Sequence, residues 1–135
     1  MKRVLCIAIC LVFVLTACGG GSAPDSNQEI VLATPPAEYA ELTNPLGAEA
    51  ASDGADIFAS TCASCHGETG KGDGIAGQSL EPKPKDLTQV NALASDGFLF
   101  WRISKGSPGT AMIGWAGILD EEQIWQVITF IRTLK

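Results

Sequence analysis

Two cysteines and the only histidine of the chain lie together within five residues. They form the run Cys62-Ala63-Ser64-Cys65-His66, which is the C-x-x-C-H pattern of c-type haem attachment. In that chemistry two thiols add across the two vinyl groups of the haem, and the adjacent imidazole binds the iron. The pattern predicts one covalently bound haem c, with His66 as the proximal metal ligand.

Other uses of these residues fit less well. A C-x-x-C redox pair needs a βαβ context, and the surrounding sequence has none. A zinc site takes four ligands, whereas Cys62, Cys65 and His66 supply three. A chain with one histidine also excludes three-histidine zinc sites and di-iron sites built from carboxylates and histidines. Haem attachment therefore remains the interpretation of this motif.

The choice of the second axial ligand is limited because the chain has few histidines and methionines. With one histidine, a haem bound by two histidines is impossible. Met112 lies in the glycine-flanked segment 109–113, and it is the only methionine apart from Met1. A lone methionine often fills a core, but on such a loop its thioether can reach the distal face of the iron. We expect Met112 to bind the iron, with an open or lysine-bound iron as the alternative.

The elements that must position these residues are helical. Residues 49–61 are rich in alanine and carry apolar residues on one side, so they predict a helix that ends just before Cys62. Ser95 or Asp96 can cap a second, short helix, and Gly106 can end it. The haem motif would then follow the first helix directly.

A third helix is indicated near the C-terminus. Asp120 and Gln123 have the spacing of a capping box, and apolar residues recur every three or four positions up to Leu134. Residues 67–85 hold many glycines and prolines and predict a loop. No alternating strand pattern occurs, so the expected fold class is all-α. A domain this small is hard to stabilise without a staple or cofactor.

The N-terminus has the pattern of a bacterial lipoprotein signal. Lys2 and Arg3 precede an apolar run over residues 4–15, which is short for a membrane span. Small residues then lead to Cys18, in an arrangement that resembles a lipobox, where the cysteine is lipidated and becomes the new N-terminus. We expect a signal peptide over 1–17 and lipidation of Cys18. An ordinary secretory signal and an uncleaved anchor helix are the alternatives.

A segment without regular periodicity follows the signal. Residues 18–47 are rich in Gly, Pro, Ser, Asn and Ala, and their prolines interrupt any helix. We expect a lipid-anchored flexible tether there, in which 39–42 could dock on another surface and the isolated apolar residues Val31 and Leu32 also favour docking. The folded domain is expected to span 48–135.

Residues 53–134 resemble a class I monohaem cytochrome c. The pieces that resemble this family, in its order, are Gly54 to Phe58, the haem motif, Gly67 to Gly74, Pro82 to Leu87, Gly97 to Gly106, the Met112 loop, and Leu119 to Leu134. The resemblance implies a small fold of about three main helices wrapped around one covalently attached haem. It also implies that the first and last helices cross at Gly54. The side chains expected around that crossing are Phe58, Val127 and Phe130.

The resemblance also implies how His66 is held and what the site does. A loop carbonyl, from Pro82 or Pro84, is expected to accept the Nδ1 proton of His66 and so orient the ring. An iron bound by His66 and Met112 has no vacancy, which suits one-electron transfer and not an enzymatic reaction. The alternative is a haem sensor or small peroxidase with an open distal site.

Charge and composition bear on the partners. A net charge of −6 and a pI near 4.6 argue against nucleic acid as a partner. Residues 19–61 carry seven acids and no Lys or Arg, whereas residues 71–105 are close to neutral. We therefore expect redox proteins or subunits of a membrane oxidoreductase complex as partners, met through a mixed or apolar contact.

The expected location is the outer face of the cytoplasmic membrane, facing the periplasm or cell exterior. Residues 35–45 weakly resemble the lipoprotein monohaem subunit of alternative complex III, a quinol-oxidising complex. Both a free carrier and a fixed haem subunit of a respiratory or photosynthetic complex stay open.

Overall fold

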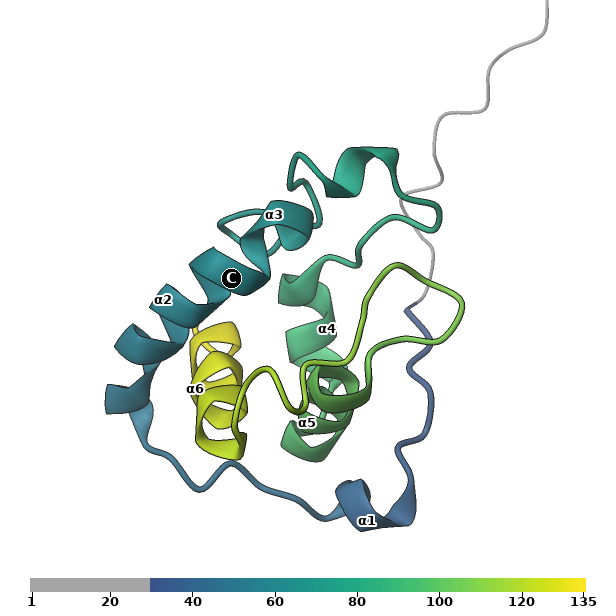
Figure 1. Ribbon diagram of the computed structural model, residues 1–135. Coiled ribbons are helices and arrows are strands. Elements are labelled where there is room, and N and C mark those ends of the chain that lie inside the picture. The colour runs from purple at the N-terminus through teal and green to yellow at the C-terminus, as the bar shows by residue number, and fades with distance from the viewer. Residues whose placement is uncertain (1–29) are drawn as a thin grey trace, which may run out of the picture.

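The structure is a computed structural model that describes residues 30–135. The predicted signal peptide, Cys18 and the first part of the tether lie outside these residues. The described chain forms the helices α1 (Ala37–Ala40), η1 (Ala48–Ala50), α2 (Ala51–Thr61), α3 (Ala63–His66), η2 (Gly77–Ser79), α4 (Leu87–Leu93), α5 (Asp96–Lys105) and α6 (Glu121–Ile131) (Figure 1). Residues 30–135 contain no named strand, which confirms the all-α fold class. None of the described helices is long and apolar enough to cross a membrane.

The three longest helices are those that the sequence predicted, and side chains cap two of them. At α5, the Ser95 hydroxyl accepts a hydrogen bond from the Phe98 N–H at 3.1 Å. At α6, the Asp120 carboxylate accepts from the Gln123 N–H at 2.8 Å, and the Gln123 side chain accepts from the Asp120 N–H at 3.0 Å. The capping box is therefore complete. The last helix ends at Ile131, three residues before Leu134.

Helix α4 was not expected from the sequence. It is only seven residues long, and its cap is Asp86, whose carboxylate accepts from the Thr88 N–H at 2.8 Å. The pKa of Asp86 is raised by burial, but bonds from Thr88 and Gln89 outweigh this effect and lower it overall. Val90 is the buried residue of this helix and joins the core. A helix this short gives too few turns for an apolar period to be seen.

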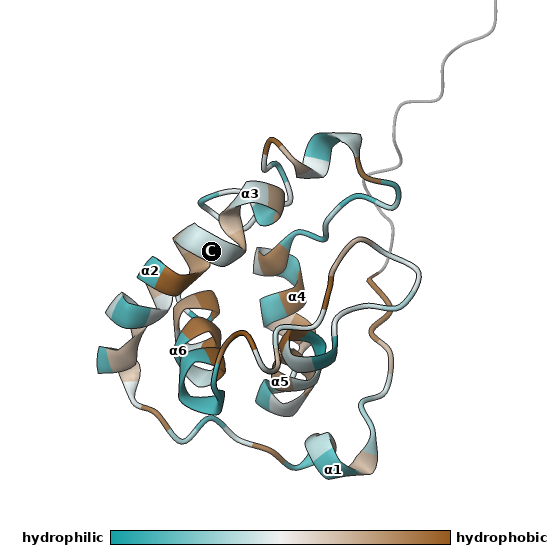
Figure 2. Cartoon of the chain, viewed as in Figure 1, coloured by the Kyte–Doolittle hydropathy of each residue, from teal (hydrophilic) through white to brown (hydrophobic). Residues whose placement is uncertain are grey.

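Helices α2 and α6 cross at close range. A Cβ atom built on Gly54 would lie 2.5 Å from the carbonyl carbon of Gln126 and 3.1 Å from Cβ of Phe130. The Phe58 and Phe130 rings are 5.0 Å apart, and Val127 is fully buried. Figure 1 shows α6 against α2 on one side and α5 on the other, and Figure 2 shows hydrophobic residues on parts of α2, α4 and α6.

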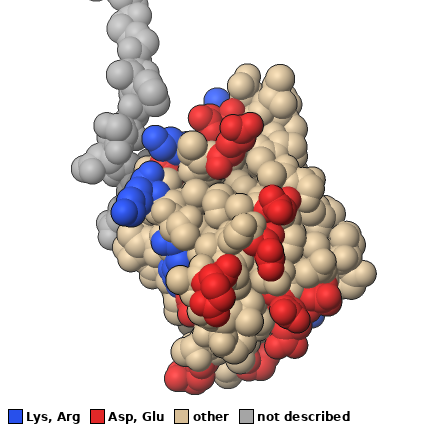
Figure 3. Space-filling view, turned by 90° about the vertical axis from the view of Figure 1, so that its left-hand side faces the viewer, with Lys and Arg blue, Asp and Glu red and all other residues tan. Residues whose placement is uncertain are grey.

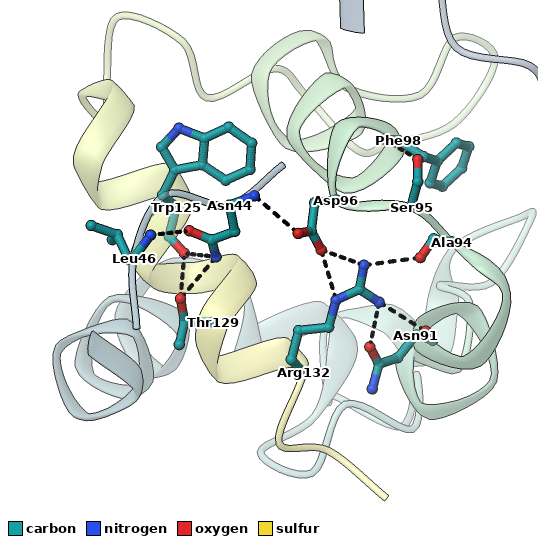
Figure 4. A network of polar contacts seen from close by, with 10 residues as sticks. All are labelled: Asn44, Leu46, Asn91, Ala94, Ser95, Asp96, Phe98, Trp125, Thr129 and Arg132. Atoms are coloured by element: carbon teal, nitrogen blue, oxygen red, sulfur yellow. Dashed lines mark hydrogen bonds and ion pairs between the residues drawn. The ribbon is translucent and has the colours of Figure 1, made fainter. Parts of the chain in front are cut away.

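Leu32 and residues 36–46 contact the domain, so the expectation of a free tether over 18–47 is wrong for this part. The Asn44 amide group donates to the Trp125 carbonyl at 3.1 Å and to the Thr129 hydroxyl at 2.9 Å (Figure 4). The Asn44 N–H donates to Asp96 at 3.0 Å. Leu42 and Leu46 pack against the core. These contacts join positions more than fifty residues apart, which local composition does not reveal.

A charged cluster joins the ends of α4, α5 and α6. Arg132 donates from Nε and Nη2 to Asp96 at 2.9 and 2.5 Å, and from Nη1 to the Asn91 side chain at 2.8 Å (Figure 4). It also donates to the Ala94 carbonyl at 2.9 Å. Burial raises the pKa of Asp96, but the bonds from Asn44 and Arg132 outweigh it and lower the pKa overall. Asp96 thus ties the N-terminal segment to the C-terminal helix.

Candidate haem site

The C-x-x-C-H residues occupy one turn of helix at the end of α2. The Cys65 and His66 N–H groups both donate to the Cys62 carbonyl, at 3.2 and 2.9 Å. This turn places the residues at positions i, i+3 and i+4, which share one helix face. Both thiols are free and half-buried. The turn from Cys62 to His66 therefore presents two sulfurs and one imidazole to the same cavity.

The loop after His66 folds back on this turn. The Gly72 N–H donates to the His66 carbonyl at 2.8 Å, and the Ala76 N–H donates to the Ser64 carbonyl at 2.9 Å. Further along, the Leu87 N–H donates to the Gly70 carbonyl at 2.7 Å, which links the start of α4 to the loop. The predicted loop over 67–85 is thus ordered around α3, and only η2 interrupts it.

His66 is oriented by the carbonyl of Lys85. Its Nδ1 donates to that oxygen at 3.3 Å, so Nε2 is the nitrogen left to bind iron. The expectation that Pro82 or Pro84 would accept this proton is wrong. The Pro84 carbonyl faces Gly72 instead, since a Cβ on Gly72 would overlap its oxygen. The next carbonyl along this irregular segment is the one that faces the ring.

Burial changes the pKa of two of the expected haem-binding groups, His66 and Cys62. It lowers the pKa of His66, and the bond to Lys85 opposes this effect only in part. Burial raises the pKa of the Cys62 thiol. The hydrogen bond with Thr61 lowers this pKa in part, and the nearby Cys65 raises it further. The imidazole is therefore held neutral, the state that binds metal, and the Cys62 thiol is held protonated.

Met112 lies on a loop that closes back on α5. The Ser107 N–H donates to the Met112 carbonyl at 2.9 Å, and the Met112 N–H donates to the Thr110 hydroxyl at 3.1 Å. Gly106 adopts a φ of 76° at the start of this loop, and a Cβ there would be 2.5 Å from the Met112 carbonyl oxygen. The backbone on both sides of Met112 is thus fixed, while its half-buried side chain packs against the core.

One cavity of about 300 Å3 brings the four expected haem-binding residues together. Cys62, Cys65, His66 and Met112 all line it. Most other lining side chains are apolar and come from α2, α4, α5, α6 and the loops, including Phe58, Leu80, Leu87, Val90, Phe98, Leu99, Ile103, Val127 and Ile131. Two thiols, an imidazole with Nε2 available and a thioether, within apolar walls, fit a covalently attached haem.

The charged side chains that line this cavity are all cationic. They are Lys83, Lys85 and Arg102, and no carboxylate lines it. Arg102 stacks 3.9 Å from the centre of the Trp101 ring and donates to the Gly106 carbonyl at 3.3 Å, so its position is fixed. Residues 71–105 are nearly neutral in total, but three of their cationic side chains line the cavity and none of their carboxylates does. Figure 3 shows acids spread over the face that carries α2, with most of the visible Lys and Arg toward one edge.

Sequence reasoning missed two contributions to the site. Lys85 supports His66 through its backbone, so no side-chain signal could identify it. Residues 31–33 line the cavity although they lie in the expected tether. Their one signal was the isolated apolar pair Val31 and Leu32 in a segment rich in Pro, Ala and polar residues.

A helical domain that encloses a C-x-x-C-H turn and a methionine loop in one apolar cavity is that of a c-type cytochrome. Within this class, residues 49–131 match the family described as cytochrome C oxidase, cbb3-type, subunit III, and the chain belongs to that family. Its cofactor is a c-type haem, and electron transfer is the chemistry of the family.

Parts of this chain are similar to known proteins. Cytochrome c55X of Stutzerimonas stutzeri is 36% identical over 66 residues, which are 47% of this chain and 49% of that protein. The Kuenenia stuttgartiensis reducing HAO-like protein complex Kustc0457/Kustc0458 is similar in structure, with a TM-score of 0.55 and 35% identity. That match covers 60% of this chain and 40% of the other. The chain therefore spans about half or less of each relative.

Proposed function

We propose that the protein transfers single electrons through one haem c that is bound covalently to Cys62 and Cys65 and ligated by His66 and Met112. The observation that carries this proposal is the single cavity lined by all four residues. Its apolar walls and its cationic lining suit the flat apolar body and the two carboxylates of a haem. The haem supplies the exchange of one electron between ferric and ferrous iron.

Each residue has a separate task in this scheme. Cys62 and Cys65 hold the cofactor on the α3 turn, and His66 presents Nε2 because the Lys85 carbonyl takes its Nδ1 proton. Met112 would supply the second iron ligand from a loop whose backbone is hydrogen-bonded to Ser107 and Thr110. With His66 and Met112 both bound, a small ligand would reach the iron only by displacing Met112, and the thioether would favour the ferrous state.

Location and partner are part of the same proposal. Lipidation of Cys18 after removal of residues 1–17 would hold the domain on the outer face of the cytoplasmic membrane, in the periplasm or at the cell exterior. There it acts as a carrier or as the haem subunit of a membrane quinol-oxidising complex. The similarity to a chain of a multi-subunit HAO-like complex supports membership of a redox assembly. Co-purification in mild detergent separates the two: a fixed subunit elutes with partners, and a carrier elutes alone.

Carbon monoxide binding tests the ligand set. The reduced wild-type protein is expected to bind carbon monoxide poorly, and Met112→Ala is expected to bind it readily. Ile113→Ala is the matched control, because Ile113 is the next residue of the same loop and is 59% exposed. Rapid, tight binding by the wild-type protein would instead indicate an open or labile iron. A haem sensor or small peroxidase would then replace electron transfer as the function.

A further inference from the structure

The haem cavity has one wall that lies outside the region shared with the family. Residues 31–33 line the cavity together with Ser107, Thr110 and Met112, whereas the family match begins only at residue 49. In this wall Val31 is 80% exposed and Ala33 is exposed, while Leu32 is half-buried and packs against the core. Leu32 is thus the side chain of this segment that contributes to the closed interior.

The chain that follows this wall is firmly attached to the domain. Asn44 makes its three bonds to α5 and α6. Tyr39 lies directly over Gly97 at the start of α5, where an added Cβ would be 3.0 Å from the Tyr39 carbonyl carbon. The Tyr39 and Phe100 rings are 6.3 Å apart. We call residues 36–46 the clasp, because these contacts fix them to helices on both sides.

Residues 31–35 are held in a different way. None of the hydrogen bonds found among residues 30–135 involves them, and the first bond of the segment is accepted by the Pro36 carbonyl. Pro35 and Pro36 have no N–H to donate and restrict the backbone where the clasp begins. Within the described part of the chain, the packing of Leu32 is therefore the main interaction that keeps this segment against the cavity.

We propose that residues 31–35 are a strap that closes the haem cavity beside the Met112 loop and opens about the clasp. The strap excludes water and small ligands from the haem, and its closure depends on Leu32. A drier cavity disfavours the more highly charged ferric state, so closure also raises the reduction potential. This inference rests on the proposed function, because it assumes haem bound through Met112.

Imidazole binding to the ferric, haem-loaded, full-length protein tests the strap. If the strap must open before imidazole enters, the association rate scales with the open fraction. Leu32→Ala removes most of one half-buried apolar side chain, so we expect an increase of about tenfold. Leu32→Asp should increase the rate further and lower the potential, and Leu32→Met, which keeps the volume, should stay near wild type.

The control is Leu93→Ala, because Leu93 is 61% exposed on α4 and does not line the cavity. Its imidazole rate and potential should equal those of the wild type. Asn44→Ala, which loosens the clasp without touching the cavity, should also raise the rate. Wild-type rates and potentials in both Leu32→Ala and Leu32→Asp would overturn the strap. Rapid carbon monoxide binding by the reduced wild-type protein would instead overturn the ligand set on which the strap rests.

Discussion

The crossing of α2 and α6 depends on the absence of a side chain at Gly54. In Gly54→Ala the new methyl group would overlap the Gln126 carbonyl oxygen and lie 2.5 Å from its carbon. An ordinary contact for a Cβ atom begins near 3.4 Å, so the helices must separate by about 1 Å. The obstacle is backbone within α6, which has no rotamer to change, so the whole helix must move.

The loss in free energy of unfolding depends on the core contacts that this movement of α6 disturbs. Overpacking of a core costs about 1–3 kcal/mol, and the upper end applies here because Phe58 and Val127 lose contact together. The replacement of a helical glycine by alanine returns about 1 kcal/mol. The expected net loss in free energy of unfolding is about 2 kcal/mol. For a domain of this size, that corresponds to a fall in Tm of about 10 °C.

Urea unfolding of the haem-loaded protein, followed by far-ultraviolet circular dichroism, measures this loss. Ser52→Ala is the matched control, because Ser52 is an exposed position of the same helix. Its effect should stay within about 0.5 kcal/mol. If Gly54→Ala were as stable as the wild type, the close approach of the helix backbones would not exist in the molecule, and the packing argument would fail.

Four further outcomes are expected. Asp96→Asn should lower the free energy of unfolding by about 1–2 kcal/mol at pH 7. Because the folded-state pKa of Asp96 is depressed, its contribution is present above about pH 4 and is lost as pH falls through the folded pKa. The difference between wild type and Asp96→Asn should therefore shrink in acid unfolding curves, and a constant gap would contradict the assignment. Joint replacement of Cys62 and Cys65 by serine should leave no covalent haem and little folded protein; normal helicity in circular dichroism would show that haem is not structural. Met112→His should keep six-coordination but lower the potential in redox titration, and an unchanged potential would mean that Met112 does not bind the iron. Cys18→Ala should release the protein from the membrane fraction or block its processing; normal processing with full retention would point to an uncleaved anchor or a protein partner.

Local patterns were enough for the parts of this protein that depend on neighbouring residues. The capping box at Asp120 and the cap at Ser95 form because each side chain reaches an N–H only three residues away. The C-x-x-C-H motif predicts the cofactor because its chemistry needs two thiols and an imidazole on one helical turn. The all-α class follows from apolar residues at helical spacing, which is likewise a local property.

Contacts between distant residues were decided only by the tertiary structure. The Lys85 carbonyl, in place of Pro82 or Pro84, supports His66 because the path of an irregular loop sets which oxygen faces the ring. Residues 36–46 lie on the domain in part because Asn44 bonds to groups more than fifty residues away. Leu32 lines the haem cavity through packing against core residues that are likewise distant in the sequence. Such contacts form only after α5 and α6 have packed, so a local pattern such as the apolar pair Val31 and Leu32 can suggest a contact but cannot specify its partner.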